Sequence, residues 1–224
     1  MSEALSIPVD VGDVGLVSAL FDAPAESRAL IVLGHGAGAG MNHGHMASIT
    51  AALNERGVAV LRFHFPYMEL GKNRTDRVEV CSAVYAAVAE AGRTRARGKP
   101  LLLGGHSFGG RMASHAVLEP SLSDVAGLVF FSFPLHMPGK PSIKRAAHLP
   151  DVTQPMLFLS GTRDNMAEED QLAAAFESVG DATVHRLFTG DHSFKILKRT
   201  RKDAEDIYVE AARVAAEWLD AKGI

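Results

Sequence analysis

The chain has 224 residues, with 23 Lys and Arg against 26 Asp and Glu, a formal net charge of −3, 47% hydrophobic residues and 22% charged residues. A charge so near balance argues against a basic surface for nucleic acid or an anionic membrane, and the length suits one domain, residues 1–224, with a full core. The single cysteine, Cys81, excludes an internal disulfide.

Neither the N-terminal sequence nor the apolar runs indicate export or a membrane anchor. The first five residues lack the basic stretch and following apolar stretch of a secretion signal. No apolar run approaches the roughly 20 residues that span a bilayer. Together with the lone cysteine, which fits a reducing compartment, these features predict a cytoplasmic protein with no membrane or nucleic-acid partner. The sequence does not indicate any protein partner.

Short apolar runs alternate with helical patterns along the chain. The runs that predict strands are residues 6–10, 14–21, 29–33, 58–63, 101–103, 125–131, 156–160 and 183–188. Helical spacing of apolar residues predicts helices over residues 46–53, 74–91, 111–118, 168–179 and 207–218. The first two strands flank Gly12-Asp13 as an antiparallel hairpin, and the later runs suit strands buried on both faces. The alternation predicts an α/β fold with a mostly parallel central sheet and helices on both faces.

A glycine-rich run, Gly34 to Gly40, follows the third strand and has three interpretations. As an oxyanion loop, its backbone N–H groups, that of Ala37 above all, would join the Phe108 N–H around a negatively charged oxygen. As a dinucleotide fingerprint it lacks support, because the segment from Leu61 to Phe65 has no acidic residue to bind a ribose. As a plain turn it is unusually long. We favour the oxyanion loop.

The segment from Leu101 to Gly110 has the layout of a nucleophile elbow. A short apolar strand stops at glycines, presents Ser107 and restarts as a helix, with the pattern Gly105-x-Ser107-x-Gly109. In such a turn, a β-carbon two residues before or after the serine would collide with the neighbouring strand or helix. The pattern alone is common, but the strand before it and the helix after it make Ser107 a candidate nucleophile.

A serine hydroxyl needs a base to take its proton and an acid to hold that base in one tautomer. Asp164 and His192 each follow a predicted strand, which gives the chain order serine, acid, histidine and places all three at the carboxyl edge of the sheet. Asp191 competes as the acid but suits a turn. Other candidates lie in connections or strands: Asp151, Asp181, His148 and His185. The sequence therefore predicts a Ser107–His192–Asp164 triad.

Histidines also gather near the glycine run, as His35 and as His43-x-His45. No carboxylate or cysteine stands at ligand spacing beside them, so we expect neither a metal nor another cofactor. Cys81 lies among apolar helix positions, and we expect it to be a core residue.

Several longer segments extend the pattern over most of the chain: residues 34–41, 62–69, 133–141, 161–164 and 190–195. Together they resemble the α/β-hydrolase superfamily and, within it, the small dienelactone-hydrolase-like proteins around testis-expressed protein thirty. The resemblance implies a single-domain α/β-hydrolase fold and the same triad, Ser107, Asp164 and His192. Asn42 replaces an expected acid and His106 an expected basic residue; we expect both near the mouth of the site without contact to the triad. The family supplies no defined substrate, and some relatives are subunits of regulatory complexes.

These residues predict a serine hydrolase that cleaves a small ester, in preference to an amide, through an acyl-enzyme. Five prolines stiffen the segment between the strands at 125–131 and 156–160, so we expect a minimal lid or none. Some cations would suit an acidic substrate, unless they are simply solvated: Arg111, Lys140, Lys144 and Arg163. The alternative is a hydrolase-fold interaction or regulatory protein with little or no turnover.

Overall fold

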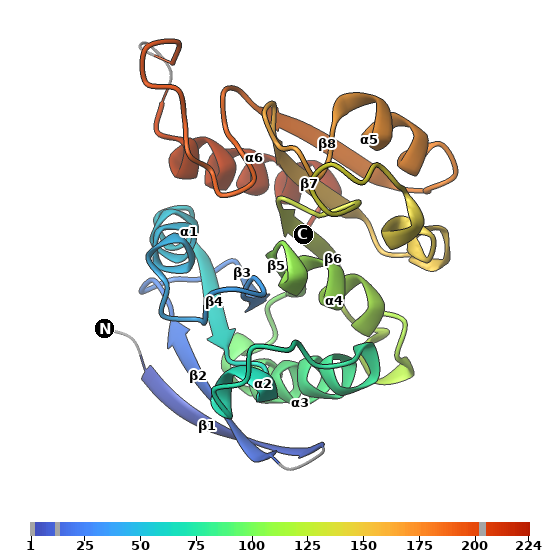
Figure 1. Cartoon of the computed structure of the whole chain (residues 1–224). Coiled ribbons are helices and arrows are strands. Elements are labelled where there is room, and N and C mark those ends of the chain that lie inside the picture. The colour runs from blue at the N-terminus through green and yellow to red at the C-terminus, as the bar shows by residue number, and fades with distance from the viewer. Residues whose placement is uncertain (1–2, 12–13, 202–204) are drawn as a thin grey trace.

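The structure is a computed structural model that describes residues 3–11, 14–201 and 205–224, so the predicted turn at Gly12-Asp13 lies outside the described residues. Eight strands within these ranges form one sheet, in the order β1-β2-β4-β3-β5-β6-β7-β8 (Figure 1). The strands are β1 (Glu3–Val11), β2 (Val14–Asp22), β3 (Ala29–Gly34), β4 (Val58–Phe63), β5 (Leu101–His106), β6 (Gly127–Phe131), β7 (Met156–Gly161) and β8 (Ala182–Leu187). The pairs β1–β2 and β2–β4 are antiparallel, and every later pair is parallel. The predicted mostly parallel sheet is confirmed.

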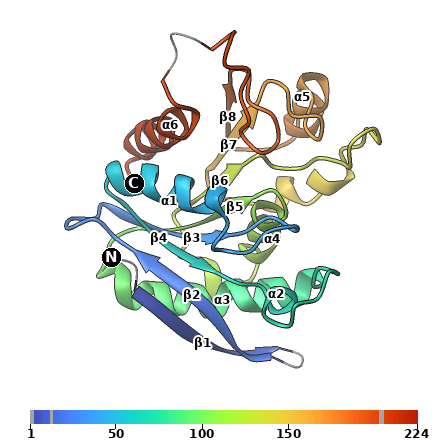
Figure 2. The same ribbon diagram turned by 60° about the vertical axis from the view of Figure 1, so that its left-hand side comes forward.

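Helices cover both faces of this sheet, as the alternating sequence pattern predicts. They are α1 (Gly44–Glu55), α2 (Pro66–Glu69), α3 (Val78–Ala96), α4 (Phe108–Ala116), α5 (Glu169–Phe176), α6 (Ile207–Lys222) and the short 3-10 helices η1 (Pro120–Leu122), η2 (Lys144–Ala146) and η3 (Leu149–Asp151). Helices α1 and α6 lie on one face, and α3 and α4 on the other (Figures 1 and 2). No helix in the described ranges is both long enough and apolar enough to cross a membrane.

Each face of the sheet has its own apolar core. Under α3 and α4, side chains such as Cys81, Val88 and Met112 pack with Phe130, and all four are buried. The core under α1 and α6 includes Trp218. Burial on both faces explains why the parallel strands read as continuous apolar runs. Cys81 is the core residue that the sequence predicts.

Helix α3 differs from the sequence prediction at both ends. The pattern predicts residues 74–91, whereas the helix runs from Val78 to Ala96. Arg77 is extended, with φ −72° and ψ 162°, and Asp76 accepts the Tyr67 N–H at 2.9 Å. The residues before Val78 therefore belong to a connection that is held by a tertiary hydrogen bond. At the other end, the basic stretch forms the last turn of the helix, where cations are favoured.

The backbone turns sharply at Ser107, between β5 and α4. Ser107 has φ 52° and ψ −113°, a conformation that costs a non-glycine residue on the order of 1–3 kcal/mol. A β-carbon on Gly109 would lie 2.2 Å from the Gly34 carbonyl oxygen, and one on Gly105 would lie 2.6 Å from the same atom. The two glycines therefore let β3, β5 and α4 approach closely and present Ser107 at the carboxyl edge of the sheet.

Substitution of Gly109 tests this close approach. Gly109→Ala should lower the free energy of unfolding by about 1–3 kcal/mol, because the new methyl group would press on the backbone of β3. Gly44→Ala is the matched control, since no atom lies within 4 Å of its new β-carbon. Urea unfolding of both variants measures the difference. Equal unfolding midpoints for the two would contradict the proposed constraint.

Candidate active site

The carboxyl edge of the sheet brings together Ser107, Asp164 and His192. Ser107 lies between β5 and α4, Asp164 follows β7, and His192 follows β8. His192 Nε2 lies 2.8 Å from Ser107 Oγ, and His192 Nδ1 lies 2.9 Å from each Asp164 carboxylate oxygen. In this arrangement the His192 Nδ1–H donates to the carboxylate, which leaves Nε2 to accept the Ser107 proton.

The Asp164 carboxylate is held from two sides. Its side chain has no exposed surface, whereas that of His192 is 17% exposed. Besides His192, the Met166 N–H donates to Asp164 Oδ1 at 2.9 Å. A buried carboxylate needs such partners, and here they also fix the direction from which it meets the imidazole.

The competing residues of the sequence analysis have other partners. Asp191 accepts the N–H groups of Ser193 and Lys195 at 2.8 and 2.9 Å, so its carboxylate closes the turn that carries His192. His185 lies on β8, with Nε2 2.8 Å from Glu210. Asp181 precedes β8 and pairs with a lysine of α6. None of these three side chains joins the Ser107 group.

Two buried side chains, His35 and Tyr67, hold the glycine-rich run after β3 through hydrogen bonds. His35 Nδ1–H donates to the Gly36 carbonyl at 2.8 Å, while His35 Nε2 accepts the Phe65 N–H at 3.2 Å. The Tyr67 hydroxyl donates to the Ala37 carbonyl at 3.0 Å. Because a trans peptide points its N–H opposite its C=O, fixing the Gly36 carbonyl also fixes the direction of the Ala37 N–H.

Two backbone N–H groups are available at this edge. In the part of the chain that the structure describes, the Ala37 N–H donates to no protein acceptor, and Ala37 is exposed. Phe108 is the first residue of α4, whose N–H has no partner within the helix. Both groups are free to receive a ligand oxygen.

His106 contacts the triad, contrary to the sequence prediction. Its Nε2–H donates to the backbone carbonyl of His192 at 3.0 Å, and the two rings lie 5.5 Å apart. The prediction was wrong because the contact joins residues 86 positions apart, which no local pattern records. Asn42, the other departure from the family pattern, is exposed before α1.

Other histidines near the site are kept neutral. Burial lowers the pKa of His35 to about 4 and that of His106 to about 4. Burial, followed by the charge of His106, lowers the pKa of His45 to about 3. His45 Nδ1 meets the Tyr208 hydroxyl at 2.9 Å, and its ring packs 4.3 Å from that of His106. His45 and His106 therefore act as uncharged hydrogen-bonding and packing groups beside His192, and His35 acts in the same way under the glycine-rich run.

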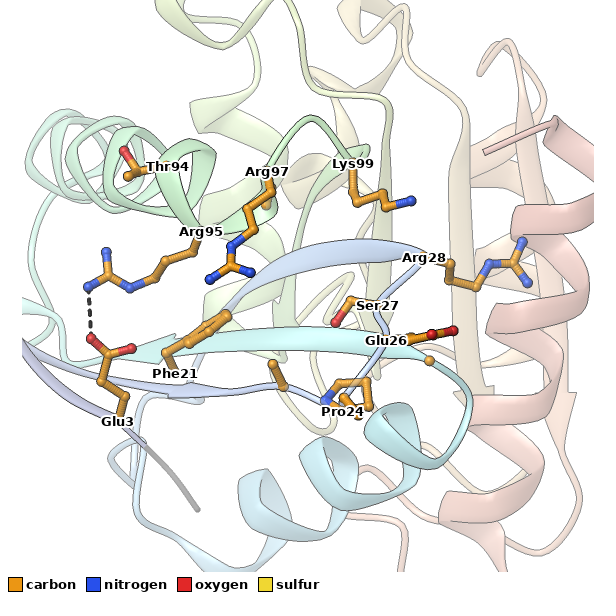
Figure 3. Close-up of a pocket in the computed structure, with 14 residues that line it drawn as sticks. Glu3, Phe21, Pro24, Glu26, Ser27, Arg28, Thr94, Arg95, Arg97 and Lys99 are labelled. Carbon is orange, nitrogen blue, oxygen red and sulfur yellow. Dashed lines mark hydrogen bonds and ion pairs between the residues drawn. The ribbon is translucent and has the colours of Figure 1, made fainter.

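A cleft of about 930 Å³ lies away from these residues (Figure 3). Its lining includes Arg28, Gly57 and Lys99, which precede β3, β4 and β5. Within it Arg95 Nη2 lies 3.1 Å from Glu3 Oε1, an ion pair that is drawn in Figure 3. Ser107 follows the opposite end of β5, and a strand of this length spans roughly 20 Å. The candidate triad and this cleft thus lie at opposite edges of the sheet.

Comparisons with known proteins agree with this architecture. A family model described as an α/β-hydrolase domain matches residues 27–220. Dienelactone hydrolase from Anabaena variabilis is 17% identical with a TM-score of 0.77, over 99% of this chain and 97% of that one. An α/β serine hydrolase without a lid from Xanthomonas campestris is 22% identical with a TM-score of 0.69, over 96% and 94%. Est1E from Butyrivibrio proteoclasticus, solved with ferulic acid, is 17% identical with a TM-score of 0.77, over 98% and 99%. At these identities the likeness concerns the fold.

The histidines whose pKa is lowered by burial make the stability of the protein depend on pH. The His106 pKa is 6.5 in the unfolded chain and about 4 in the fold, so between these values the unfolded state binds more protons. The free energy of unfolding should therefore fall as the pH falls from 6.5 to 4, by at most about 1.4 kcal/mol per pH unit for each such histidine.

His106→Gln isolates one of these contributions. The glutamine amide keeps an N–H for the His192 carbonyl but does not titrate. Its free energy of unfolding, measured with urea over the same pH range, should fall less steeply than that of the wild type. Parallel pH curves for the two proteins would contradict a depressed His106 pKa.

Proposed function

The chain belongs to the α/β-hydrolase domain family, and on that premise we propose that it is a serine hydrolase that cleaves a small ester through Ser107, His192 and Asp164. The observation that carries the proposal is the continuous hydrogen-bonded series from Ser107 Oγ through both ring nitrogens of His192 to the buried Asp164 carboxylate. An ordinary surface serine has neither a strained backbone nor an imidazole acceptor of this kind.

In the first half of the reaction, Ser107 Oγ attacks the ester carbonyl carbon while its proton moves to His192 Nε2. Asp164 stabilises the imidazolium that forms. The Ala37 and Phe108 N–H groups donate to the oxygen of the tetrahedral intermediate, which carries more negative charge than the ester carbonyl did. The intermediate collapses when the bond to the alcohol oxygen breaks, and His192 donates its proton to the departing alcohol.

In the second half, water replaces the alcohol. His192 takes a proton from the water as the water oxygen attacks the acyl carbon, and the same two N–H groups again hold the oxyanion. Breakdown of this intermediate releases the acid, and His192 returns its proton to Ser107 Oγ. The reaction needs no cofactor, since every proton transfer passes through His192.

An open site suits small esters. The segment after β6, residues 132–155, contains only the short helices η2 and η3 in the described chain, and it is tied down rather than free to close. The Leu135 N–H donates to the Met166 carbonyl at 2.9 Å, and His136 Nε2 meets Glu168 at 2.7 Å. The Xanthomonas serine hydrolase without a lid and the ferulic-acid complex of Est1E support an esterase proposal for this related fold.

Loss of the nucleophile is the direct test. Ser107→Ala should lower kcat on any para-nitrophenyl ester that the wild type cleaves by about 10⁴-fold or more, because no acyl-enzyme can form. A fluorophosphonate probe should label the wild type on Ser107 and leave the variant unlabelled. Unlabelled wild type without esterase activity would instead favour a hydrolase-fold interaction protein.

A second variant tests the oxyanion loop. Ala37→Pro removes the proposed donor and should lower kcat by about 10²–10³-fold with little change in KM, because the bond strengthens only in the transition state. Gly38→Ala is a control in the same loop, where the new β-carbon meets no atom within 4 Å. The melting temperature of Ala37→Pro must match that of the wild type, since proline restricts the backbone.

Nucleotide binding by the same proteins tests whether the glycine-rich run is an oxyanion loop or a dinucleotide-binding loop. Calorimetry should detect no binding of NAD or NADP by the wild type. Binding that disappears in Ala37→Pro, with no esterase activity in either protein, would overturn the oxyanion assignment.

A further inference from the structure

His106 joins three separate parts of the candidate active site. It is the last residue of β5 and directly precedes Ser107. Its Nε2–H donates to the His192 carbonyl at 3.0 Å. A β-carbon on Gly36 would lie 2.8 Å from His106 Nδ1, so the glycine-rich run packs directly against the same ring. One residue therefore meets the turn of the serine, the segment of the histidine and the loop of the proposed oxyanion donor.

The hydrogen bond from His106 connects parts of the sheet that are far apart. His192 follows β8, and the strand order places β6 and β7 between β5 and β8. Three steps between neighbouring strands amount to roughly 14 Å. The bond thus crosses the carboxyl edge of the sheet and links the segment after β8 to the strand that presents Ser107.

The segment that carries His192 is shaped by hydrogen bonds of its own. The Asp191 N–H donates to the Lys195 carbonyl, and the Phe194 N–H donates to the Asp191 carbonyl, both at 3.0 Å. These bonds close the turn, but they do not fix its distance from β5. Within the described ranges no backbone N–H donates to the His192 carbonyl, so the His106 ring is the group that satisfies it.

The His106 ring is itself restricted. The His45 ring packs 4.3 Å from it, and His45 Nδ1 meets the Tyr208 hydroxyl of α6 at 2.9 Å. Burial lowers the pKa of His106 to about 4, so the ring is neutral near neutral pH and carries a single N–H. That N–H is on Nε2, because the His192 carbonyl can only accept. The ring is therefore a fixed, uncharged donor beside the triad.

We propose that His106 is a positioning residue that holds His192 at its working distance from Ser107. The inference rests on the proposed function, and it adds a residue that acts through His192. Proton transfer needs the 2.8 Å separation of His192 Nε2 and Ser107 Oγ, and a displacement of about 1 Å can lower the rate about 10²-fold. Because His106 acts on this geometry, its loss should lower kcat and leave KM nearly unchanged.

Two amide variants that differ by one methylene test this role. The amide nitrogen of a glutamine can occupy the place of His106 Nε2, whereas that of an asparagine reaches only the place of Nδ1. His106→Gln should keep kcat for a para-nitrophenyl ester within about threefold of the wild type. His106→Asn should lower kcat about 10- to 100-fold, with KM within about twofold. Equal kcat values for the two variants, or a loss that lies in KM, would overturn the positioning role.

Two further variants are controls. His106→Leu restores apolar bulk without a donor and should lose kcat as His106→Asn does; wild-type kcat in this variant would show that the donor is not needed. His185 lies on β8 with Nε2 2.8 Å from Glu210. His185→Asn removes a histidine contact from the same strand and should leave kcat within about twofold. A fall as large as that of His106→Asn would contradict a specific role for His106.

Hydrogen exchange separates this inference from the proposed function. Exchange of the backbone N–H groups in residues 188–197, measured by mass spectrometry, reports opening of the His192 segment without any turnover. It should be about 10-fold faster in His106→Asn than in the wild type and His106→Gln. This difference without ester hydrolysis by the wild type would reject the proposed function and retain the role of His106 in holding His192. Equal exchange in all three proteins would reject that role even if the wild type hydrolyses esters.

Discussion

The close approach of β3, β5 and α4 determines the rest of the site. Gly109 packs so tightly on the Gly34 carbonyl that no side chain fits between them, and Ser107, two residues earlier, has an unusual backbone conformation. The same contact brings the glycine-rich run after β3 beside the first turn of α4. A single backbone constraint thus sets both the position of the hydroxyl and the position of the two N–H groups near it.

The electrostatic surroundings of His192 differ from those of the other histidines near this backbone framework. His35 and His45 are buried and His106 is partly buried, and burial favours the neutral forms of all three. Each is engaged with a backbone group or a hydroxyl, which restricts its ring orientation. His192 is the ring that meets a buried carboxylate and keeps some access to solvent. Under the proposed function, this arrangement would limit proton exchange with substrate to His192.

The sequence predicts the sheet and the grouping of Ser107, Asp164 and His192 because both follow from local patterns combined with the rules of parallel sheets. Each residue follows an apolar run, and the carboxyl ends of parallel strands meet at one edge. The beginning of α3 was not predicted, because Asp76 is held there by a hydrogen bond from Tyr67. The contact of His106 with His192 also escaped prediction. Such contacts depend on segments that are far apart in the chain, and no periodicity records them.

The strands that carry the three side chains of the site differ in local stability. Ser107 follows β5, which has a strand on each side, whereas His192 follows β8, which is the last strand of the sheet in the described residues and pairs with β7. Elements at an edge open locally more readily than those in the middle. A brief separation of β8 would carry away the imidazole, together with the core side chains Leu187 and Phe194, and leave the serine and the glycines on the central strands in place. Under the proposed function the protein would then be largely folded but inactive, so loss of the fold and loss of activity would have different thresholds.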